Sequence, residues 1–290
     1  MNTDPRQPDE IDPRAPAAAP ILTVDSVSRH FDTADGRIDA VSDISLSVSR
    51  GEFVSIIGPS GCGKSTLFSM IGGLLPASAG AIRIENEAIR GPHPAIGMVF
   101  QEDSTFPWRT VIENVAFPLE LQGVPKAERL EKARHFIDLV GLTGFERSYP
   151  AQLSGGMRQR VSIARTLVFE PKLLLMDEPF AALDEQTRLL LGDKVSQIQA
   201  TLQQTVLLIT HNIAEAVQLS DRVMIMSYRP GRCKRILPID LPRPRTSEML
   251  SSDAFGHYVA RIWADLREEA GRGMRETEGA PAHGGGHASA

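Results

Sequence analysis

The apolar residues of this chain form short continuous runs that alternate with segments of helical spacing. The run Phe53–Ile57 predicts a buried strand, and a glycine-rich loop follows it. Beyond that loop, apolar residues within 67–74 recur at i, i+3, i+4 and i+7, which is the spacing of one helix face. The runs Lys172–Met176 and Thr205–Thr210 repeat the strand pattern, with a helical pattern between them. This alternation predicts a parallel α/β sheet.

The segment from about residue 102 to residue 165 differs from its surroundings, because it has helical periodicity and no convincing strand. Within it, the apolar residues of Lys126–Val140 repeat at helical spacing, Pro125 precedes them and Gly141 follows them. We therefore expect an all-helical segment, residues 102–165, inserted into the α/β domain and giving the protein two lobes.

The two ends of the chain have a different composition from the middle. The first twenty residues hold five prolines, and residues 271–290 are mostly Gly, Ala, Glu and His without periodic apolar positions. We expect disordered tails at 1–20 and 271–290, with a helical extension at 246–270. His283 and His287 fit a solvated tail better than a metal site.

Composition narrows the class of protein. The 290 residues carry 31 Lys and Arg against 36 Asp and Glu, and this net charge of −5 argues against nucleic acid as a partner. No apolar run approaches the ~20 residues that span a bilayer. The start of the chain lacks the features of a secretion signal, so we expect a cytoplasmic protein. The two cysteines, Cys62 and Cys233, form neither a disulfide framework nor a metal-ligand cluster. We therefore expect that a metal ion, if one is bound, enters the site together with a bound small-molecule ligand.

The glycine-rich loop carries the most specific chemical signal. GPSGCGKST satisfies G-x-x-x-x-G-K-[ST] between a strand and a helix, which predicts a phosphate-binding loop. Its glycines let backbone N–H groups converge on a β-phosphate, while Lys64 bridges β- and γ-phosphates and Ser65 binds Mg²⁺. The predicted nucleotide-binding residues of this loop are Gly58, Pro59, Ser60, Gly61, Cys62, Gly63, Lys64, Ser65 and Thr66.

Two acids follow the apolar run that starts at Leu173. Buried carboxylates are costly unless they bind a cation or water, so Asp177 fits the magnesium ion and Glu178 fits a group that polarises attacking water. The alternative is a strand end with two solvated acids, and the nearby phosphate loop makes that alternative much weaker.

Six motifs, in their order and spacing, resemble those of the ATP-binding-cassette (ABC) ATPases. They are GPSGCGKST, Gln101, LSGGM at 153–157, LLLMDEP at 173–179, ALD at 182–184 and His211. The resemblance covers about residues 21–245. It implies a P-loop NTPase α/β core with a parallel sheet, an N-terminal antiparallel β subdomain and an inserted all-helical subdomain. It also implies ATP and Mg²⁺ as ligands.

The resemblance assigns roles to residues outside the phosphate loop. Ser154, Gly155 and Gly156 open a helix and would cap the γ-phosphate of a partner copy's ATP, so two copies would sandwich two nucleotides head to tail. The remaining implied roles are a γ-phosphate contact for His211, a link from magnesium and water to the helical lobe for Gln101, and communication across the dimer for Asp184. A core histidine and a surface glutamine are the plainer alternatives for His211 and Gln101.

Phe31 stands where many members of this family have a tyrosine that stacks on adenine. Phenylalanine keeps the π-face and loses only the hydroxyl. His30 is an alternative stacking residue, and Phe31 could also be an ordinary core residue. Within the loop, backbone dipoles and Lys64 predict that Cys62 favours its thiolate form.

Two segments resemble the nitrate, sulfonate and taurine importer branch: QEDSTFPWRTVIENVAF at 101–117 and DLPRPR at 240–245. The branch implies an ATPase at the cytoplasmic face of the inner membrane that energises uptake of a small anion or organic solute. Its partners would be membrane permease subunits and, through them, a periplasmic substrate-binding protein. Phe106 and Trp108 would anchor a permease helix, or alternatively pack inside the helical lobe, and Arg109 departs from the apolar residue usual in the branch.

Other functions fit the sequence less well. An ATPase of an exporter or lipid-extracting complex is the main alternative. An ATP-driven clamp on nucleic acid or ribosomes usually needs a basic surface, a coiled-coil insertion or two cassettes in one chain, and a P-loop kinase would lack LSGGM. Sulfonates, nitrate, bicarbonate, pyrimidine precursors and aromatic acids are all compatible substrates.

Overall fold

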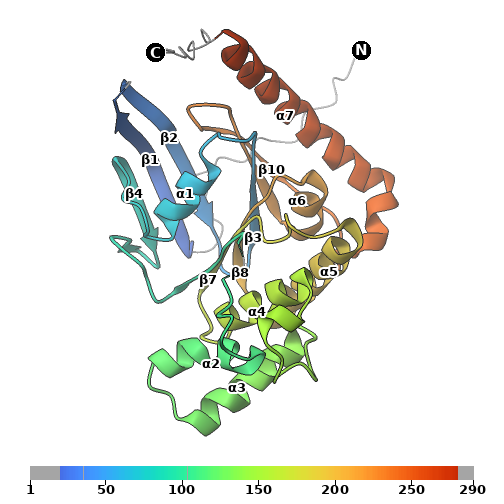
Figure 1. Cartoon of the computed structure of the whole chain (residues 1–290). Coiled ribbons are helices and arrows are strands. Elements are labelled where there is room, and N and C mark those ends of the chain that lie inside the picture. Colours follow the sequence, from blue (N-terminus) through green and yellow to red (C-terminus); the bar gives the residue numbers. More distant parts are fainter. Residues whose placement is uncertain (1–19, 35, 103, 280–290) are drawn as a thin grey trace, which may run out of the picture.

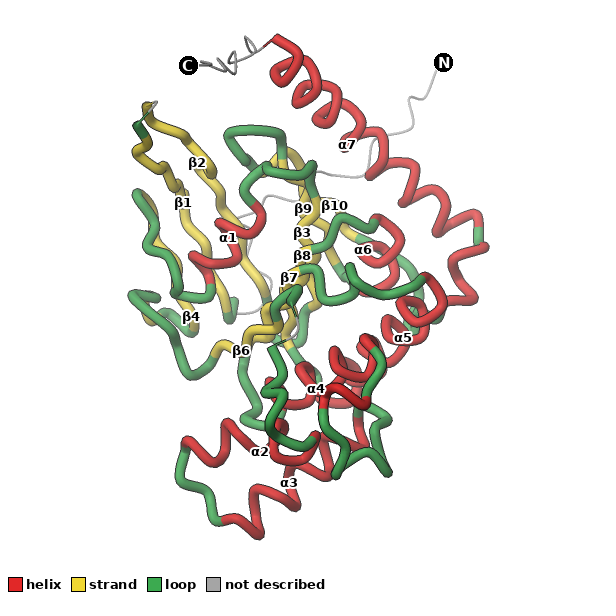
Figure 2. Tube along the Cα trace, in the orientation of Figure 1, coloured by secondary structure: helices red, strands yellow, loops and turns green. Residues whose placement is uncertain are grey.

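The computed structural model describes residues 20–34, 36–102 and 104–279, with side chains described as far as residue 272. A mainly parallel sheet with helices stands at the centre, an antiparallel sheet flanks it, and a helical lobe extends below (Figure 1; Figure 2 separates helices from strands by colour). His283, His287 and most of both predicted tails lie outside the described residues.

The central sheet has the strand order β10-β9-β3-β8-β7-β6. Every residue of β3 and β8 is buried, which explains why these strands are continuous apolar runs in the sequence. All neighbours are parallel except β10, which pairs antiparallel with β9 at one edge. The strands are β3 (Phe53–Ile57), β6 (Ile96–Val99), β7 (Leu173–Asp177), β8 (Thr205–Ile209), β9 (Arg222–Met226) and β10 (Cys233–Pro238). The predicted α/β core is confirmed.

A separate antiparallel sheet, in the order β2-β1-β4-β5, comes mostly from the N-terminal part of the chain. Its strands are β1 (Leu22–Thr33), β2 (Gly36–Val48), β4 (Ala79–Ile84) and β5 (Glu87–Ala88). Helix α1 (Lys64–Ile71) lies between the two sheets (Figure 1), and one apolar cluster joins Leu67 and Ile71 of this helix to Ile44 and Leu46 of β2. The helix after the phosphate loop is thus clamped between two sheets.

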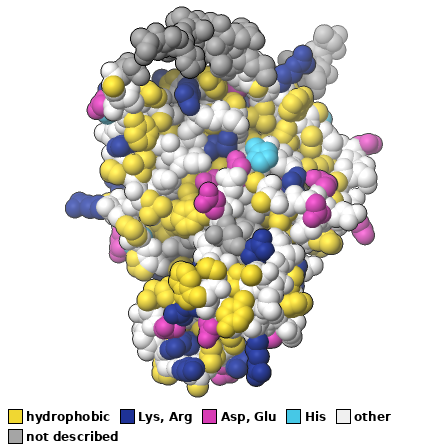
Figure 3. Space-filling model, in the orientation of Figure 1, with side chains coloured by type: hydrophobic (Ala, Val, Ile, Leu, Met, Phe, Trp, Pro, Cys, Tyr) yellow, Lys and Arg dark blue, Asp and Glu magenta, His cyan; other side chains and the backbone are white. Residues whose placement is uncertain are grey.

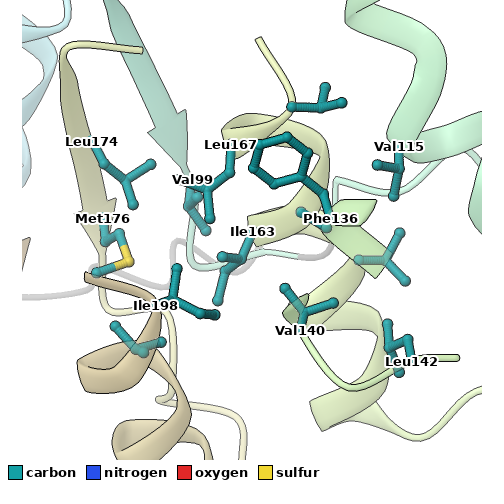
Figure 4. Packing of buried hydrophobic residues seen from close by; sticks show 14 of the residues in the cluster. Val99, Val115, Phe136, Val140, Leu142, Ile163, Leu167, Leu174, Met176 and Ile198 are labelled. Atoms are coloured by element: carbon teal, nitrogen blue, oxygen red, sulfur yellow. The ribbon is translucent and has the colours of Figure 1, made fainter. Parts of the chain in front are cut away.

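The helical lobe contains α2 (Val111–Leu121), α3 (Lys126–Leu139), a short 3-10 turn (Pro150–Gln152) and α4 (Gly155–Leu167). No strand occurs in the described residues of 102–165. Figure 4 shows Ile163 and Leu167 of α4 packed between Val99 of the sheet and Phe136 of α3. The helical lobe and the central sheet therefore share one hydrophobic core, to which α4 contributes from between them.

The remaining helices complete the core lobe, and the last one is longer than predicted. They are α5 (Glu185–Leu202), α6 (Ile213–Leu219), a 3-10 turn (Ser247–Ser251) and α7 (Asp253–Gly279). The composition predicts a disordered tail from residue 271, but α7 continues to Gly279. At that boundary Arg272 pairs with Glu268, one turn earlier in the helix, at 2.8 Å. Nearer the start of the helix, Phe255 and Ile262 are buried in an apolar cluster. Among the described residues, no helix has both the length and the apolar character to span a membrane.

Candidate functional site

The phosphate loop joins the buried strand β3 to α1. Gly61 and Gly63 have φ values of +74° and +100°, in the left-handed region that glycine adopts without steric cost. A Cβ at Gly63 would lie 2.6 Å from the carbonyl oxygen of Ala40, so space as well as backbone geometry requires glycine there. Gly63 is the N-cap of α1, and the first N–H groups of a helix have no partner within it. These N–H groups are suited to bind an anion.

Lys64 places a cation inside the loop. Its Nζ donates hydrogen bonds to the carbonyl oxygens of Gly58 at 2.8 Å and Pro59 at 3.0 Å. The residue is only 7% exposed, although it is the first residue of α1. A buried ammonium beside a helix N-terminus favours a multiply charged anion such as a phosphate chain.

Ser65 and Asp177 form a pair of oxygen ligands next to Lys64. The carboxyl group of Asp177, at the end of β7, is hydrogen bonded to the Ser65 side chain. The pKa of Asp177 is raised, and burial is the largest cause. The negative charge of Glu178 raises this pKa further, while the Ser65 hydrogen bond and the positive charge of Lys64 lower it. A hydroxyl and a carboxylate are ligands that Mg²⁺ accepts, so the donor set fits a magnesium ion that takes its other oxygens from phosphate and water. The described residues contain no cluster of three or more metal-binding side chains.

Glu178 and His211 come together beside this pair. His211 Nδ1 lies 3.1 Å from Glu178 Oε2, and the histidine side chain is 58% exposed, so the structure rules out a core histidine. Glu178 has a φ of +44°, a strained conformation for a residue with a side chain. Its main-chain N–H donates to the carbonyl oxygen of Ile209 at 2.8 Å, which holds it next to the end of β8. The arrangement places a carboxylate and an imidazole where the strands end.

A cavity of about 450 Å³ opens over the loop. Phe31, Ile38 and Ala40 line it from the antiparallel sheet, and Glu178 and Arg229 line it from the core lobe. From the phosphate loop itself, the lining residues are Ser60, Gly61, Gly63, Lys64, Ser65 and Thr66. Gly58, Pro59 and Cys62 are outside this lining.

Phe31, and not His30, faces the cavity. Successive residues of a strand point to opposite faces, so the two side chains cannot both line it. The guanidinium of Arg29 lies 4.7 Å from the centre of the Phe31 ring and covers one of its faces. The half-buried ring therefore has one face available for a flat ligand, and the interpretation of Phe31 as an ordinary core residue does not hold.

Gln101 and Asp184 lie outside this cavity's lining. Gln101 is exposed just beyond β6, in a segment that leads into the helical lobe. Asp184 is the N-cap of α5 and accepts a 2.9 Å hydrogen bond from the main-chain N–H of Thr187. That bond lowers the pKa of the Asp184 carboxyl. Within a single chain, Asp184 therefore starts a helix, and its predicted role across a dimer remains a prediction.

The segment Ser154–Gly156 lies at the N-terminus of α4, in the other lobe. Ser154 is the N-cap, and its side chain accepts a 3.3 Å hydrogen bond from the N–H of Met157. A Cβ at Gly156 would lie 2.6 Å from the Thr187 side chain, so glycine allows α4 and α5 to approach closely. None of the three residues lines the cavity described above. The glycine-rich motifs of the chain thus lie at two separate helix N-termini, that of α1 and that of α4.

The prediction for Cys62 is wrong. Its side chain is fully buried and belongs to the apolar cluster beneath the loop. Burial raises the pKa of the Cys62 thiol, and this effect exceeds the opposing effects of Lys64 and the backbone hydrogen bonds. Cys62 therefore anchors the phosphate loop in the hydrophobic core and is not a reactive thiolate.

Sequence reasoning missed Arg229, a second cation at the cavity. Its Nε donates to the carbonyl oxygen of Gly61 at 2.8 Å, across 168 positions of the sequence. The residue lies in the turn between β9 and β10, where no motif indicated a function. The pairing of β9 with β3 brings that turn to the phosphate loop, and this pairing joins segments far apart in the sequence.

The relatives of this chain are ABC proteins. Residues 41–181 match the family model described as ABC transporter. An uncharacterized ABC transporter ATP-binding protein of Methanocaldococcus jannaschii is 47% identical over 248 residues, 86% of this chain and 92% of that protein. The nitrate import ATP-binding protein NrtD of Synechocystis is 43% identical (89% and 98% covered). The aliphatic sulfonates import ATP-binding protein SsuB of Bacillus cereus is 42% identical (83% and 94% covered).

Solved structures agree with this assignment. The dimeric structure of a bacterial ABC transporter cassette, MJ0796, matches with a TM-score of 0.68 and 30% identity, covering 76% of this chain and all of that one. The same cassette in a post-hydrolysis state bound to ADP and Pi matches with a TM-score of 0.67. CbiO1 of Clostridium perfringens, part of the transporter complex cbiONQ, matches with a TM-score of 0.69 and 28% identity, covering 88% and 99%. The chain therefore belongs to the ABC transporter family, as an ATP-binding and ATP-hydrolysing cassette of the branch that includes the nitrate and sulfonate import proteins.

Proposed function

We propose that this ATPase powers an importer: ATP binding and hydrolysis drive uptake of a small anion or organic solute through a membrane permease. The observation that carries the proposal is the match to nitrate and sulfonate import proteins, which extends over more than four fifths of the chain. A match of that length includes most of the helical lobe and is not limited to the phosphate loop. The protein would work as a peripheral subunit at the cytoplasmic face of the membrane, with a periplasmic binding protein delivering the solute.

The cavity supports a nucleotide arrangement in which each residue has a defined task. Phe31 stacks on the base, Lys64 and the loop N–H groups bind the phosphates, and Ser65 and Asp177 hold Mg²⁺, with Gln101 reaching the ion from the helical lobe. When bound by Ser65 and Asp177, Mg²⁺ would supply positive charge that offsets the negative charge of the phosphate chain. Glu178 accepts a proton from the attacking water, and the 3.1 Å contact with His211 orients its carboxylate.

The position of Ser154–Gly156 supports a dimer with shared sites. This helix end lies in the helical lobe, away from the cavity of its own chain. In a head-to-tail pair, this N-terminal end of α4, called the signature from here on (Ser154–Gly156), would cap in one copy the γ-phosphate bound by the other. Asp184, exposed at the start of α5, would then face the partner copy.

An aromatic group on the helical lobe supports permease binding. Phe106 packs against Phe117 and Trp108, with ring centres 4.7 Å and 5.5 Å away, and Trp108 is 72% exposed. Arg109 is engaged inside the lobe, because it binds Glu120 at 3.0 Å and lies over the ring of Phe117. Phe106 therefore holds the three rings together, and Trp108 is the ring that is exposed to a binding partner. Figure 3 shows hydrophobic side chains gathered on the helical lobe in the lower part of the view.

Reconstitution with the cognate permease tests the importer function. Proteoliposomes that hold the permease should accumulate solute, added with its binding protein outside, only when this ATPase and ATP are present on the other face. Trp108→Ala should release the ATPase from the permease during co-purification. Trp263→Ala, which removes the 59% exposed tryptophan of α7, is the matched control and should leave the complex intact. ATP-driven efflux of solute in place of uptake would contradict the proposal.

A further inference from the structure

The turn between β9 and β10, residues 227–232, presses against the phosphate loop. Arg229 bonds to the carbonyl oxygen of Gly61. Gly231 approaches the next loop residue so closely that a Cβ on it would lie 2.0 Å from the carbonyl oxygen of Cys62. Two main-chain hydrogen bonds of Gly231, at 2.9 and 3.0 Å, tie the same turn to β2. The turn is therefore fixed against the loop by contacts that tolerate no side chain at position 231.

Arg229 contacts the phosphate loop and also lines the cavity above it. The C=O and N–H of a trans peptide point in opposite directions, so the Gly61–Cys62 peptide is held from both sides: Arg229 binds its carbonyl, and its N–H donates to Pro59 at 3.3 Å. The guanidinium also lines the cavity and is exposed, and Lys64 is the other cationic side chain of that lining. An Arg side chain has five N–H donors, so four remain for phosphate oxygens after the bond to Gly61.

Helix α7 holds this turn from the opposite side. Glu269, only 1% exposed, accepts a 3.0 Å hydrogen bond from the main-chain N–H of Tyr228, the neighbour of Arg229. Its other oxygen lies 2.9 Å from Nζ of Lys234 on β10. A buried carboxylate is stable only with its partners in place, so these bonds fix where the turn starts. Helix α7 is thus connected to the phosphate loop through two hydrogen bonds: Glu269 binds the main chain of Tyr228, and the next residue, Arg229, binds Gly61.

We propose that Arg229 is a positioning residue for ATP and that α7 is part of the nucleotide site, because Glu269 holds the turn that carries Arg229. The guanidinium keeps the phosphate loop in its binding shape and adds a second cation beside the phosphates. ATP affinity in this protein therefore depends on its C-terminal helix. The inference rests on ATP binding in the cavity over the loop, which is part of the proposed function, and not on the direction of transport.

Nucleotide affinity and steady-state kinetics of the full chain test this inference. Arg229→Ala should raise the Kd and KM for ATP about tenfold and change kcat by less than about twofold, since Glu178 and His211 remain in place. Arg229→Lys should recover part of the affinity, because it restores the charge but not the planar donor group. Glu269→Ala should raise KM about threefold and add little when Arg229→Ala is already present. Glu268→Ala, on the same helix and paired with Lys234 and Arg272, is the control and should leave KM unchanged.

Different failures have different meanings. ATP affinity of Arg229→Ala within about twofold of the parent would overturn the role of Arg229. Equal effects of Glu268→Ala and Glu269→Ala, or full additivity in the double variant, would overturn the role of α7. If Glu269→Ala does not fold, Glu269→Gln replaces it, with the same direction expected and an unchanged KM as the contradicting result. Unchanged affinity in Lys64→Ala would instead remove ATP from this cavity and defeat the inference together with the proposed nucleotide arrangement.

Discussion

The two helix ends that carry glycine-rich motifs differ in how the fold surrounds them. The phosphate loop lies between two sheets, with Lys64 buried and Gly63 held by a close backbone contact. The signature end of α4 lies in the helical lobe, with Ser154 and Gly155 exposed. One motif is enclosed by its own chain, and the other is presented at the surface. A site shared between two copies requires this difference. Each copy then offers a phosphate loop enclosed by its own chain and an exposed N-terminus of α4 that can close the site of the other copy.

The largest expected effect is at the enclosed end. Lys64→Ala should weaken ATP binding by at least about a hundredfold, because it removes a buried cation that the loop carbonyls hold ready for the phosphates. The control is Lys172→Ala, which removes a half-exposed lysine paired with Glu85; it directly precedes β7, at the opposite end of that strand from Asp177. Isothermal titration with ATP would measure both variants. Equal affinities in the two variants would contradict the assignment of the loop.

Glu178→Gln separates binding from cleavage. The amide keeps the size of the side chain but cannot take a proton from water, so hydrolysis should fall by about a hundredfold or more while ATP still binds. Because cleavage no longer separates the copies, this variant should form a dimer when ATP is added. Sedimentation with and without ATP would measure the change. A variant that stays monomeric with ATP at high concentration, even with its permease present, would argue against the shared site.

A smaller effect is expected at the base. Stacking on Phe31 involves only one ring face, because Arg29 covers the other, so Phe31→Ala should weaken ATP and GTP about fivefold each. Phe31→Tyr should be close to neutral, and His30→Ala should have no effect on affinity. Nucleotide titrations of the three variants with both purines would decide. Parental ATP affinity in Phe31→Ala would place the base elsewhere.

Local sequence patterns predicted the central strands and the phosphate loop, because strand, loop and helix follow one another directly there. The fully buried strands β3 and β8 appear in the sequence as unbroken apolar runs. The partners of that loop depend on tertiary contacts that no local pattern contains. Arg229 reaches Gly61 because β9 pairs with β3 and because Gly231 of the same turn bonds to β2. The anchor at Glu269 comes from the helical extension predicted at 246–270, to which the sequence assigned no function.

Two predictions made from the local sequence were wrong. Cys62 was expected to be a thiolate because its sequence neighbours are N–H dipoles and a lysine, but its side chain points into the core and burial raises its pKa. The composition of residues 271–290 predicted that the helix ends near residue 270, whereas α7 continues to Gly279 and Arg272 pairs with Glu268 across that boundary. For Cys62, the direction of the side chain relative to the core decided the outcome, and the neighbouring residues in the sequence do not reveal that direction.

Mixing two inactive variants tests the shared site most directly. Ser154→Arg fills the open cap, and Lys64→Ala disables the enclosed pocket, so each variant alone should lack ATPase activity. In a heterodimer of the two, one site carries both lesions and the other combines an intact phosphate loop with an intact signature. ATPase activity that appears on mixing, and that is absent from either variant alone, is the predicted result. No recovery, with heterodimers demonstrated by differently tagged subunits, would contradict the claim that each ATP is held between two copies.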